Sequence, residues 1–81
     1  MLVTVRLFAR LREIAGDGEL QVDVQGGATV ADAWATLTSR HPELAAYTAI
    51  ISCAVNEDYT RMTAALHEND EIAFLPPVSG G

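Results

Sequence analysis

One long helical pattern, between Thr29 and Pro42, most constrains the fold, because every other segment with regular apolar spacing is short. Thr29 is a suitable N-cap, and Asp32 three residues later completes a capping-box pattern. Pro42 ends the helix, since the residue before a proline is disfavoured in the α region. The residues that share one face of this predicted helix are Val30, Ala33, Trp34, Leu37 and, at its end, His41.

Alternating apolar residues predict five short strands around this helix, at residues 3–7, 20–24, 50–55, 62–66 and 71–75. The turn signals between strands are Gly16-Asp17-Gly18, Gly26-Gly27, Asn56-Glu57-Asp58 and Glu68-Asn69-Asp70. Residues 10–14 have helical or turn spacing, and Pro42 can open a second short turn.

This order of elements predicts an α+β fold in which the helix covers one face of a single mixed sheet of about five strands. A helical connection suits strands that do not form a hairpin. The expected architecture is the β-grasp, or ubiquitin-like, fold, with the first and last strands parallel and adjacent at the centre of the sheet. We expect residues 1–75 to form one domain and residues 76–81 to form an extended tail.

The net charge and the hydropathy of the chain limit the classes of partner that we expect it to bind. The net charge is −6, and the five basic residues are all arginine, so a basic surface for nucleic acid is not expected. The acidic balance suits either a basic partner surface or simple solubility. No apolar run approaches about 18 residues, and residues 1–8 do not resemble a signal peptide, so we expect a cytoplasmic protein with no membrane span.

No arrangement typical of catalysis stands out in the sequence. Cys53 lies on an apolar strand face and is expected to be a buried small hydrophobe, whereas His67 beside an acidic turn is expected to be solvated. We find no metal-ligand spacing, no pairing of a nucleophile with a base and no phosphate-binding glycine loop. A chain of this size has little core to spare for a deep cleft, so we expect no catalytic pocket.

The end of the sequence is the strongest functional signal. Its residues are Pro76, Pro77, Val78, Ser79, Gly80 and Gly81. The prolines favour an extended path, and six extended residues reach at most about 20 Å. The glycines have no Cβ, so this backbone can enter a channel that would exclude a side chain. We interpret the segment as a thin arm that delivers the Gly81 carboxylate; the alternative is an ordinary frayed terminus.

A second candidate surface lies beside the root of this arm. If Val3, Val5 and Leu7 face the helix, Phe8 points to the other side of the sheet, as does Leu75 in the last strand. Tyr59 is expected in a turn nearby. Phe8, Tyr59 and Leu75 are therefore predicted to form an exposed apolar patch for a partner, with scattered surface apolar residues as the alternative.

These residues resemble a known family over the whole chain. The chain is similar to the small, sulfur-carrying subunits of molybdopterin synthase, the MoaD type of the ubiquitin-like ThiS/MoaD sulfur carriers. The ending Pro-Pro-Val-Ser-Gly-Gly favours the molybdopterin branch over the thiamine branch. One departure is Asn69, at a position where the family commonly has glycine; both residues tolerate turn geometry. The segments that carry the resemblance are residues 7–13, 54–57 and 69–81.

The resemblance implies a chemistry for the arm. An E1-like activating enzyme would use ATP to adenylate Gly81, and a sulfur donor such as a cysteine desulfurase or rhodanese-type protein would convert it to a thiocarboxylate. The large subunit of molybdopterin synthase would hold the active-site pocket, where the sulfur passes to cyclic pyranopterin monophosphate. The family implies a heterotetramer in which this subunit is non-catalytic and binds no cofactor.

Three other functions stay open at this point. The chain could carry sulfur for thiamine, tRNA thiolation or cysteine synthesis, since the fold and the activation chemistry are shared. It could be a ubiquitin-like modifier that is joined to lysines of target proteins. It could also be an interaction module with an inert tail.

Overall fold

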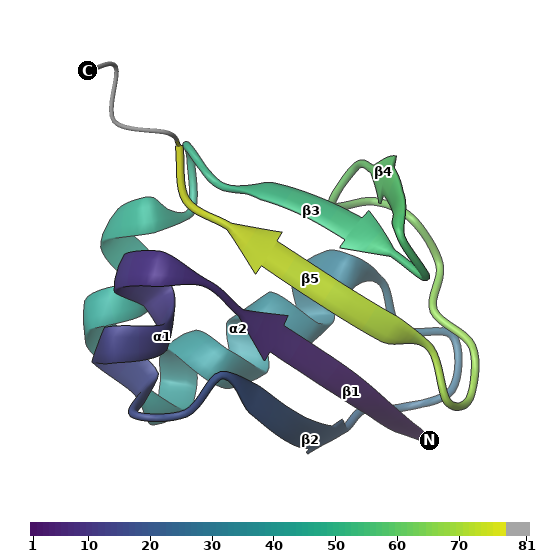
Figure 1. Ribbon diagram of the computed structural model, residues 1–81. Helices are drawn as coiled ribbons and strands as arrows, with labels where there is room; N and C mark the ends of the chain where they lie inside the picture. Colours follow the sequence, from purple (N-terminus) through teal and green to yellow (C-terminus); the bar gives the residue numbers. More distant parts are fainter. Residues whose placement is uncertain (78–81) are drawn as a thin grey trace.

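The computed structural model describes residues 1–77, which form one five-stranded mixed sheet with the helices packed on one face (Figure 1). The strand order is β2-β1-β5-β3-β4, in which β1 and β5 are parallel and the other neighbours antiparallel. The predicted β-grasp architecture is confirmed. The elements are β1 (Leu2–Leu7), α1 (Ala9–Ala15), β2 (Glu19–Asp23), α2 (Val30–Arg40), the 3₁₀ helix η1 (Pro42–Tyr47), β3 (Ser52–Val55), β4 (Asp58–Thr60) and β5 (Glu71–Leu75).

Helix α2 begins as the sequence predicts. The Asp32 carboxylate accepts a hydrogen bond from the Thr29 backbone N–H at 2.8 Å, and the Thr29 hydroxyl accepts one from the Asp32 N–H at 3.4 Å. This reciprocal pair is a capping box that satisfies donors which have no partner inside the helix. The helix ends at Arg40, and the residue before Pro42 is its C-cap.

The core lies between α2 and the helix-facing side of the sheet. Trp34 of α2 packs against Phe74 of β5, with ring centroids 4.8 Å apart, and the Trp34 indole N–H donates to the Thr48 hydroxyl at 2.9 Å. Cys53 is 3% exposed, which confirms it as a small core residue. The other fully buried side chains that fill this layer include Val3, Val5, Leu7, Leu11, Val22, Val30, Leu37, Leu44 and Ile72.

The fourth strand differs from the prediction. It is β4, which pairs with β3 in a hairpin, so Tyr59 lies in a strand and not in a turn. The loop between Val55 and Asp58 is two residues long, and both of its residues, Asn56 and Glu57, have positive φ (50° and 74°). Positive φ at both positions is the requirement of a type I′ hairpin turn, where glycine normally follows asparagine. Because Glu57 takes the place of this glycine, the sequence lacks the usual indication of a two-residue hairpin.

The predicted strand at residues 62–66 is wrong. Within it the structure has one isolated bridge, from Thr29 to Ala65. Its carbonyl groups accept hydrogen bonds from the first turn of α2: Val30 N–H donates to the Ala64 carbonyl at 3.0 Å, and Ala31 N–H donates to the Met62 carbonyl at 2.8 Å. Helix N-termini have unpaired N–H groups, so this segment caps α2 and does not join the sheet.

Helix α1 follows β1 with one residue between them. Its first residue, Ala9, has a φ of +51°, a left-handed conformation that is uncommon for a residue with a side chain. Gly16, with a φ of +80°, is its C-cap. The described residues contain no helix that is both long and apolar enough to span a membrane.

Candidate functional site

The root of the C-terminal segment lies at one end of the sheet. Strand β5 is the middle strand, and it ends at Leu75, followed by Pro76 and Pro77. Because β5 runs parallel to β1, the end of β5 and the start of α1 lie at the same end of the sheet, opposite the N-terminus (Figure 1). Val78, Ser79, Gly80 and Gly81, which carry the predicted delivery role, lie outside the described residues.

An apolar groove lies directly beside this root. It is open to solvent and has a volume of about 510 Å³. Three elements that are distant in the sequence build it: the start of α1, the end of η1 and the end of β5. We call it the root groove, and its residues are Phe8, Ala9, Arg10, Tyr47, Leu75, Pro76 and Pro77.

The chain places Phe8 in this groove through strand alternation and a sharp turn. Leu7 is buried and pairs with Phe74 in the parallel register, so the following residues, Phe8 and Leu75, lie level on the outer face. The left-handed backbone of Ala9 then starts α1 immediately after Phe8. The Phe8 side chain stays 39% exposed, with the Arg6 guanidinium carbon 5.8 Å from the centre of its ring. A large apolar ring thus stands at the tail root.

Tyr59 lies on the same outer face as Phe8 but apart from the groove. It pairs with Ala54, which pairs with Ala73, which pairs with Arg6, so one row of residues crosses four strands. Tyr59 is 75% exposed at the edge of the sheet and does not line the root groove. The structure brings together Phe8 and Leu75, but not Tyr59. Their predicted role in partner binding stays a prediction.

Two further residues, Tyr47 and Arg10, line the groove and were not predicted from the sequence. Tyr47 ends η1 and is half-buried, and Arg10 lies in the first turn of α1. The Arg10 guanidinium donates to the Glu13 carboxylate at 3.1 Å, and hydrogen bonds to Glu13 and Tyr47 raise the pKa of Arg10 above its usual value. The sequence does show an aromatic residue, Tyr47, a few residues after Pro42. Its position beside Leu75 and Pro76, however, depends on tertiary packing.

A polar network holds the opposite end of the sheet. The Asp70 carboxylate accepts from the Asn56 side-chain amide at 2.9 Å and from the His67 backbone N–H at 2.7 Å. The Asn56 side-chain oxygen in turn accepts from the Glu71 N–H at 3.0 Å. Partial burial alone would raise the pKa of Asp70, but these hydrogen bonds and the nearby His67 outweigh it, and the net pKa is lowered. Asn69, with a φ of +69°, makes the adjoining turn.

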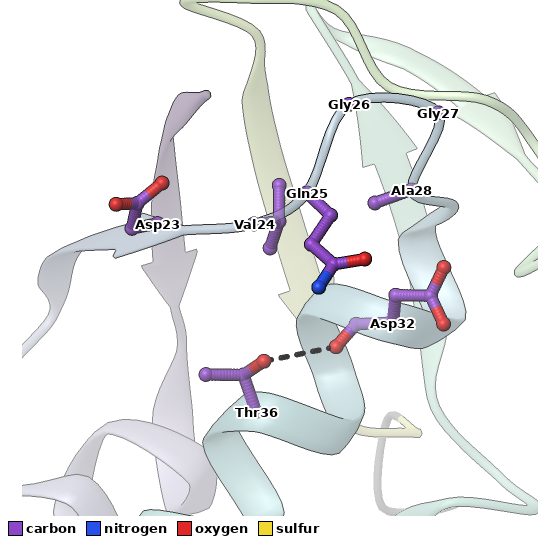
Figure 2. A pocket seen from close by; sticks show the side chains of 8 residues that line it. All are labelled: Asp23, Val24, Gln25, Gly26, Gly27, Ala28, Asp32 and Thr36. Atoms are coloured by element: carbon purple, nitrogen blue, oxygen red, sulfur yellow. Dashed lines mark hydrogen bonds between the residues drawn. The ribbon is translucent and has the colours of Figure 1, made fainter.

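A second depression, of about 400 Å³, lies between the end of β2 and the start of α2. Figure 2 shows Gln25 between the carboxylates of Asp23 and Asp32, below the Gly26-Gly27 loop. Both carboxylates already serve the fold: Asp23 pairs with the terminal ammonium group at 3.2 Å, and Asp32 closes the capping box. Among residues 1–77, no group of three histidine, cysteine or acidic side chains could hold a metal ion.

Comparison with known proteins gives a consistent picture. The family model described as the ThiS family matches residues 5–81. The molybdopterin synthase sulfur carrier subunit of Arabidopsis thaliana is 35% identical over 79 residues, covering 98% of this chain and 82% of the relative. The protein of the same description from Chlamydomonas reinhardtii is 36% identical over 83 residues and 100% of both chains.

A third relative has a different description. The small archaeal modifier protein 1 of Haloferax volcanii is 38% identical over 84 residues, covering 94% of this chain and 97% of the relative. The crystal structure of SAMP1 from that organism matches with a TM-score of 0.87, at 35% identity over 100% of both chains. Both groups of relatives therefore match the whole β-grasp domain described above.

Proposed function

Since this chain belongs to the ThiS family, we propose that it is a sulfur carrier of molybdenum cofactor biosynthesis, with the sulfur held as a thiocarboxylate on Gly81. The observation that carries the proposal is the full-length similarity to the sulfur carrier subunits, in which the family match runs through residue 81. The root groove beside the last described residues supports it, because it offers an apolar contact surface where the carrier segment begins.

The chemistry must begin outside this chain. A carboxylate is a poor electrophile, so an activating enzyme uses ATP to form the Gly81 acyl adenylate with release of pyrophosphate. The persulfide of a sulfur donor then attacks the carbonyl carbon, the C–O bond to AMP breaks, and an acyl disulfide forms. A donor thiol reduces this disulfide: the S–S bond to the acyl sulfur breaks, a disulfide forms on the donor, and the thiocarboxylate remains. This chain binds no cofactor in these steps. Its own contribution is a terminal segment whose two glycines have no Cβ to obstruct a narrow active site.

The proposed acceptor site belongs to the large subunit of molybdopterin synthase. The root groove and the exposed ring of Phe8 contact that subunit, so that the segment after Pro77 points into its pocket. There the sulfur passes to cyclic pyranopterin monophosphate. Two carriers on a dimer of large subunits form the heterotetramer, and the reactions take place in the cytoplasm.

Intact-mass spectrometry of the protein from its native cells tests this proposal. The expected result is a fraction whose mass gain corresponds to one oxygen replaced by sulfur. A variant that lacks Gly81 should fold and melt like the wild type, because the change lies outside the packed core, and should form no thiocarboxylate with the activating enzyme, ATP and sulfide. Thiocarboxylate on the deletion variant would contradict the proposal.

A second function is favoured by small archaeal modifier protein 1, whose sequence identity of 38% is at least as high as that of the sulfur carrier subunits, at 35% and 36%. In that case the activated Gly81 would form an isopeptide bond with a lysine of a target protein. Enrichment of the tagged chain from native cells under denaturing conditions separates the two functions. Covalent adducts of larger proteins indicate a modifier, and a thiocarboxylated free chain alone indicates a dedicated carrier.

A further inference from the structure

We infer that this chain donates its activated C-terminus only to other molecules: no lysine, α-amine or thiol of the same copy can capture it, so the chain does not close on itself. This inference rests on the proposed activation of Gly81. Three kinds of side chain or terminal group react readily with an activated acyl carbon, namely lysine amines, the α-amine and the cysteine thiol. Each is excluded by a separate cause.

Lysine is excluded by composition. The chain has five basic residues, and all are arginine: Arg6, Arg10, Arg12, Arg40 and Arg61. A guanidinium group stays protonated at any physiological pH and is therefore a very poor nucleophile. Three of these arginines lie at or near the tail-root end of the sheet, and Arg10 lines the root groove itself. The arginines beside the tail root thus carry positive charge without a reactive amine.

The α-amine is excluded by distance and by its contacts. Met1 precedes β1, and the parallel register places Phe8 level with Leu75, so the amine lies seven residues, or about 23 Å, along the sheet from the tail root. Six residues follow Leu75, and they reach at most about 20 Å. The ammonium group also donates to the Val24 carbonyl at 2.6 Å and to the Asp23 carboxylate at 3.2 Å. Intramolecular attack by this amine is out of reach.

The thiol of Cys53 is within reach but inaccessible. Cys53 pairs with Phe74, one residue before the end of β5, and its side chain faces the core with 3% exposure. Its Sγ donates to the Thr60 carbonyl at 3.3 Å, and burial raises the pKa of the thiol. Attack on an acyl carbon requires an exposed thiolate. Because Cys53 is buried in the core, its thiol cannot attack the activated C-terminus.

The test uses a Gly81 thioester made by chemical ligation, which needs no activating enzyme. Incubation of the dilute protein at mildly alkaline pH should convert the wild-type thioester to the free acid, and intact mass should show no cyclic monomer. In Arg10→Lys the new amine lies in the root groove. Its nitrogen attacks the Gly81 carbonyl carbon, the C–N bond forms, the C–S bond breaks, the thiol leaves, and the amine proton passes to solvent. The product is a cyclic monomer lighter than the acid by one water.

Gln25→Lys is the matched control, because it adds the same amine in the depression of Figure 2, at the far end of β1. Its backbone neighbour Val24 hydrogen bonds to Met1, so the amine lies about as far from the tail root as Met1 does. We expect at least a tenfold excess of cyclic product in Arg10→Lys over Gln25→Lys.

Self-acylation of the wild type, mapped to Met1 or Cys53, would overturn the inference, and so would equal behaviour of the two lysine variants. The result stays separate from the proposed function, because failure of the enzyme-driven thiocarboxylate assay above leaves this chemical assay unaffected. If the chain also modifies proteins, a target cannot carry chains of copies linked through lysine, because the chain contains no lysine.

Discussion

The two ends of the sheet are built from different chemistry. The end where β5 finishes exposes an apolar groove around Phe8 and Leu75, whereas the end where β5 starts is fixed by the polar network of Asn56 and Asp70. Exposed apolar surface adds nothing to the stability of the free chain, and a satisfied polar network contributes little to an apolar contact. We propose that the polar end maintains the fold and that the groove end binds the partner.

The largest effect that we expect is a loss of affinity for the large subunit when the groove end is changed. Phe8→Arg places an unpaired charge in the root groove, so we expect binding to the large subunit to weaken by about 2 kcal/mol or more, roughly 30-fold, in calorimetry. The melting temperature should stay near that of the wild type, because Phe8 is exposed.

Tyr59→Arg is the matched control for Phe8→Arg. It adds the same charge on the same outer face, but outside the groove. If the groove is the main contact, the loss of affinity should be several-fold smaller than for Phe8→Arg. Equal losses would show that the whole outer face binds the partner, and no loss in either variant would place the contact elsewhere.

The next effect is on stability and belongs to the polar end. Asp70→Asn weakens the hydrogen bonds to Asn56 and His67, and we expect it to lower the free energy of unfolding by about 1–2 kcal/mol at pH 7 in denaturant titrations. The lowered pKa of Asp70 means that its contribution is present above the unfolded-state pKa of about 4 and is lost as the pH falls through the lower folded-state pKa.

The pH dependence provides the control for that variant. The gap in stability between the wild type and Asp70→Asn should narrow as the pH falls below about 4. Affinity for the large subunit at neutral pH should be unchanged, since the network lies at the other end of the sheet from the groove. A gap that widens in acid would show that Asp70 does not act through its charge.

The smallest effects come from Glu57 and Ala9, two of the four residues with side chains that have a positive φ. Glu57→Gly should raise the free energy of unfolding by about 0.5–1 kcal/mol, because glycine adopts a φ of 74° without strain. Glu57→Ala should give no such gain. Ala9→Gly relieves similar strain at the groove end, where it should also loosen the placement of Phe8 and weaken partner binding slightly. A stability gain from Glu57→Ala equal to that from Glu57→Gly would argue against backbone strain.

Most of the fold could be predicted because its strongest patterns are local. The capping box of α2 and the alternation in β1 and β5 each fix an element by themselves. The β3–β4 hairpin was missed because Glu57 occupies a position where glycine is the usual signal. Residues 62–66 alternate like a strand, but their carbonyl groups cap α2, a role that depends on tertiary contacts.

The candidate site could be predicted in part, as could the fold. Alternation along β1 and β5 assigns Phe8 and Leu75 to the outer face, and the parallel register brings them together. Tyr47 and Arg10 enter the groove only through the packing of η1 and α1, which no local pattern indicates. The separation of Tyr59 from the groove follows from the hairpin that the sequence concealed.

The most direct test of the account is a single-turnover sulfur transfer reaction. Thiocarboxylated protein is mixed with cyclic pyranopterin monophosphate, first alone and then with the large subunit of molybdopterin synthase. We expect no reaction by the chain alone and, with the large subunit, product formed in proportion to the carrier, with Gly81 returned to the carboxylate. Product formed without the large subunit, or a thiocarboxylate that survives product formation, would contradict the role of this chain as a carrier that has no catalytic site.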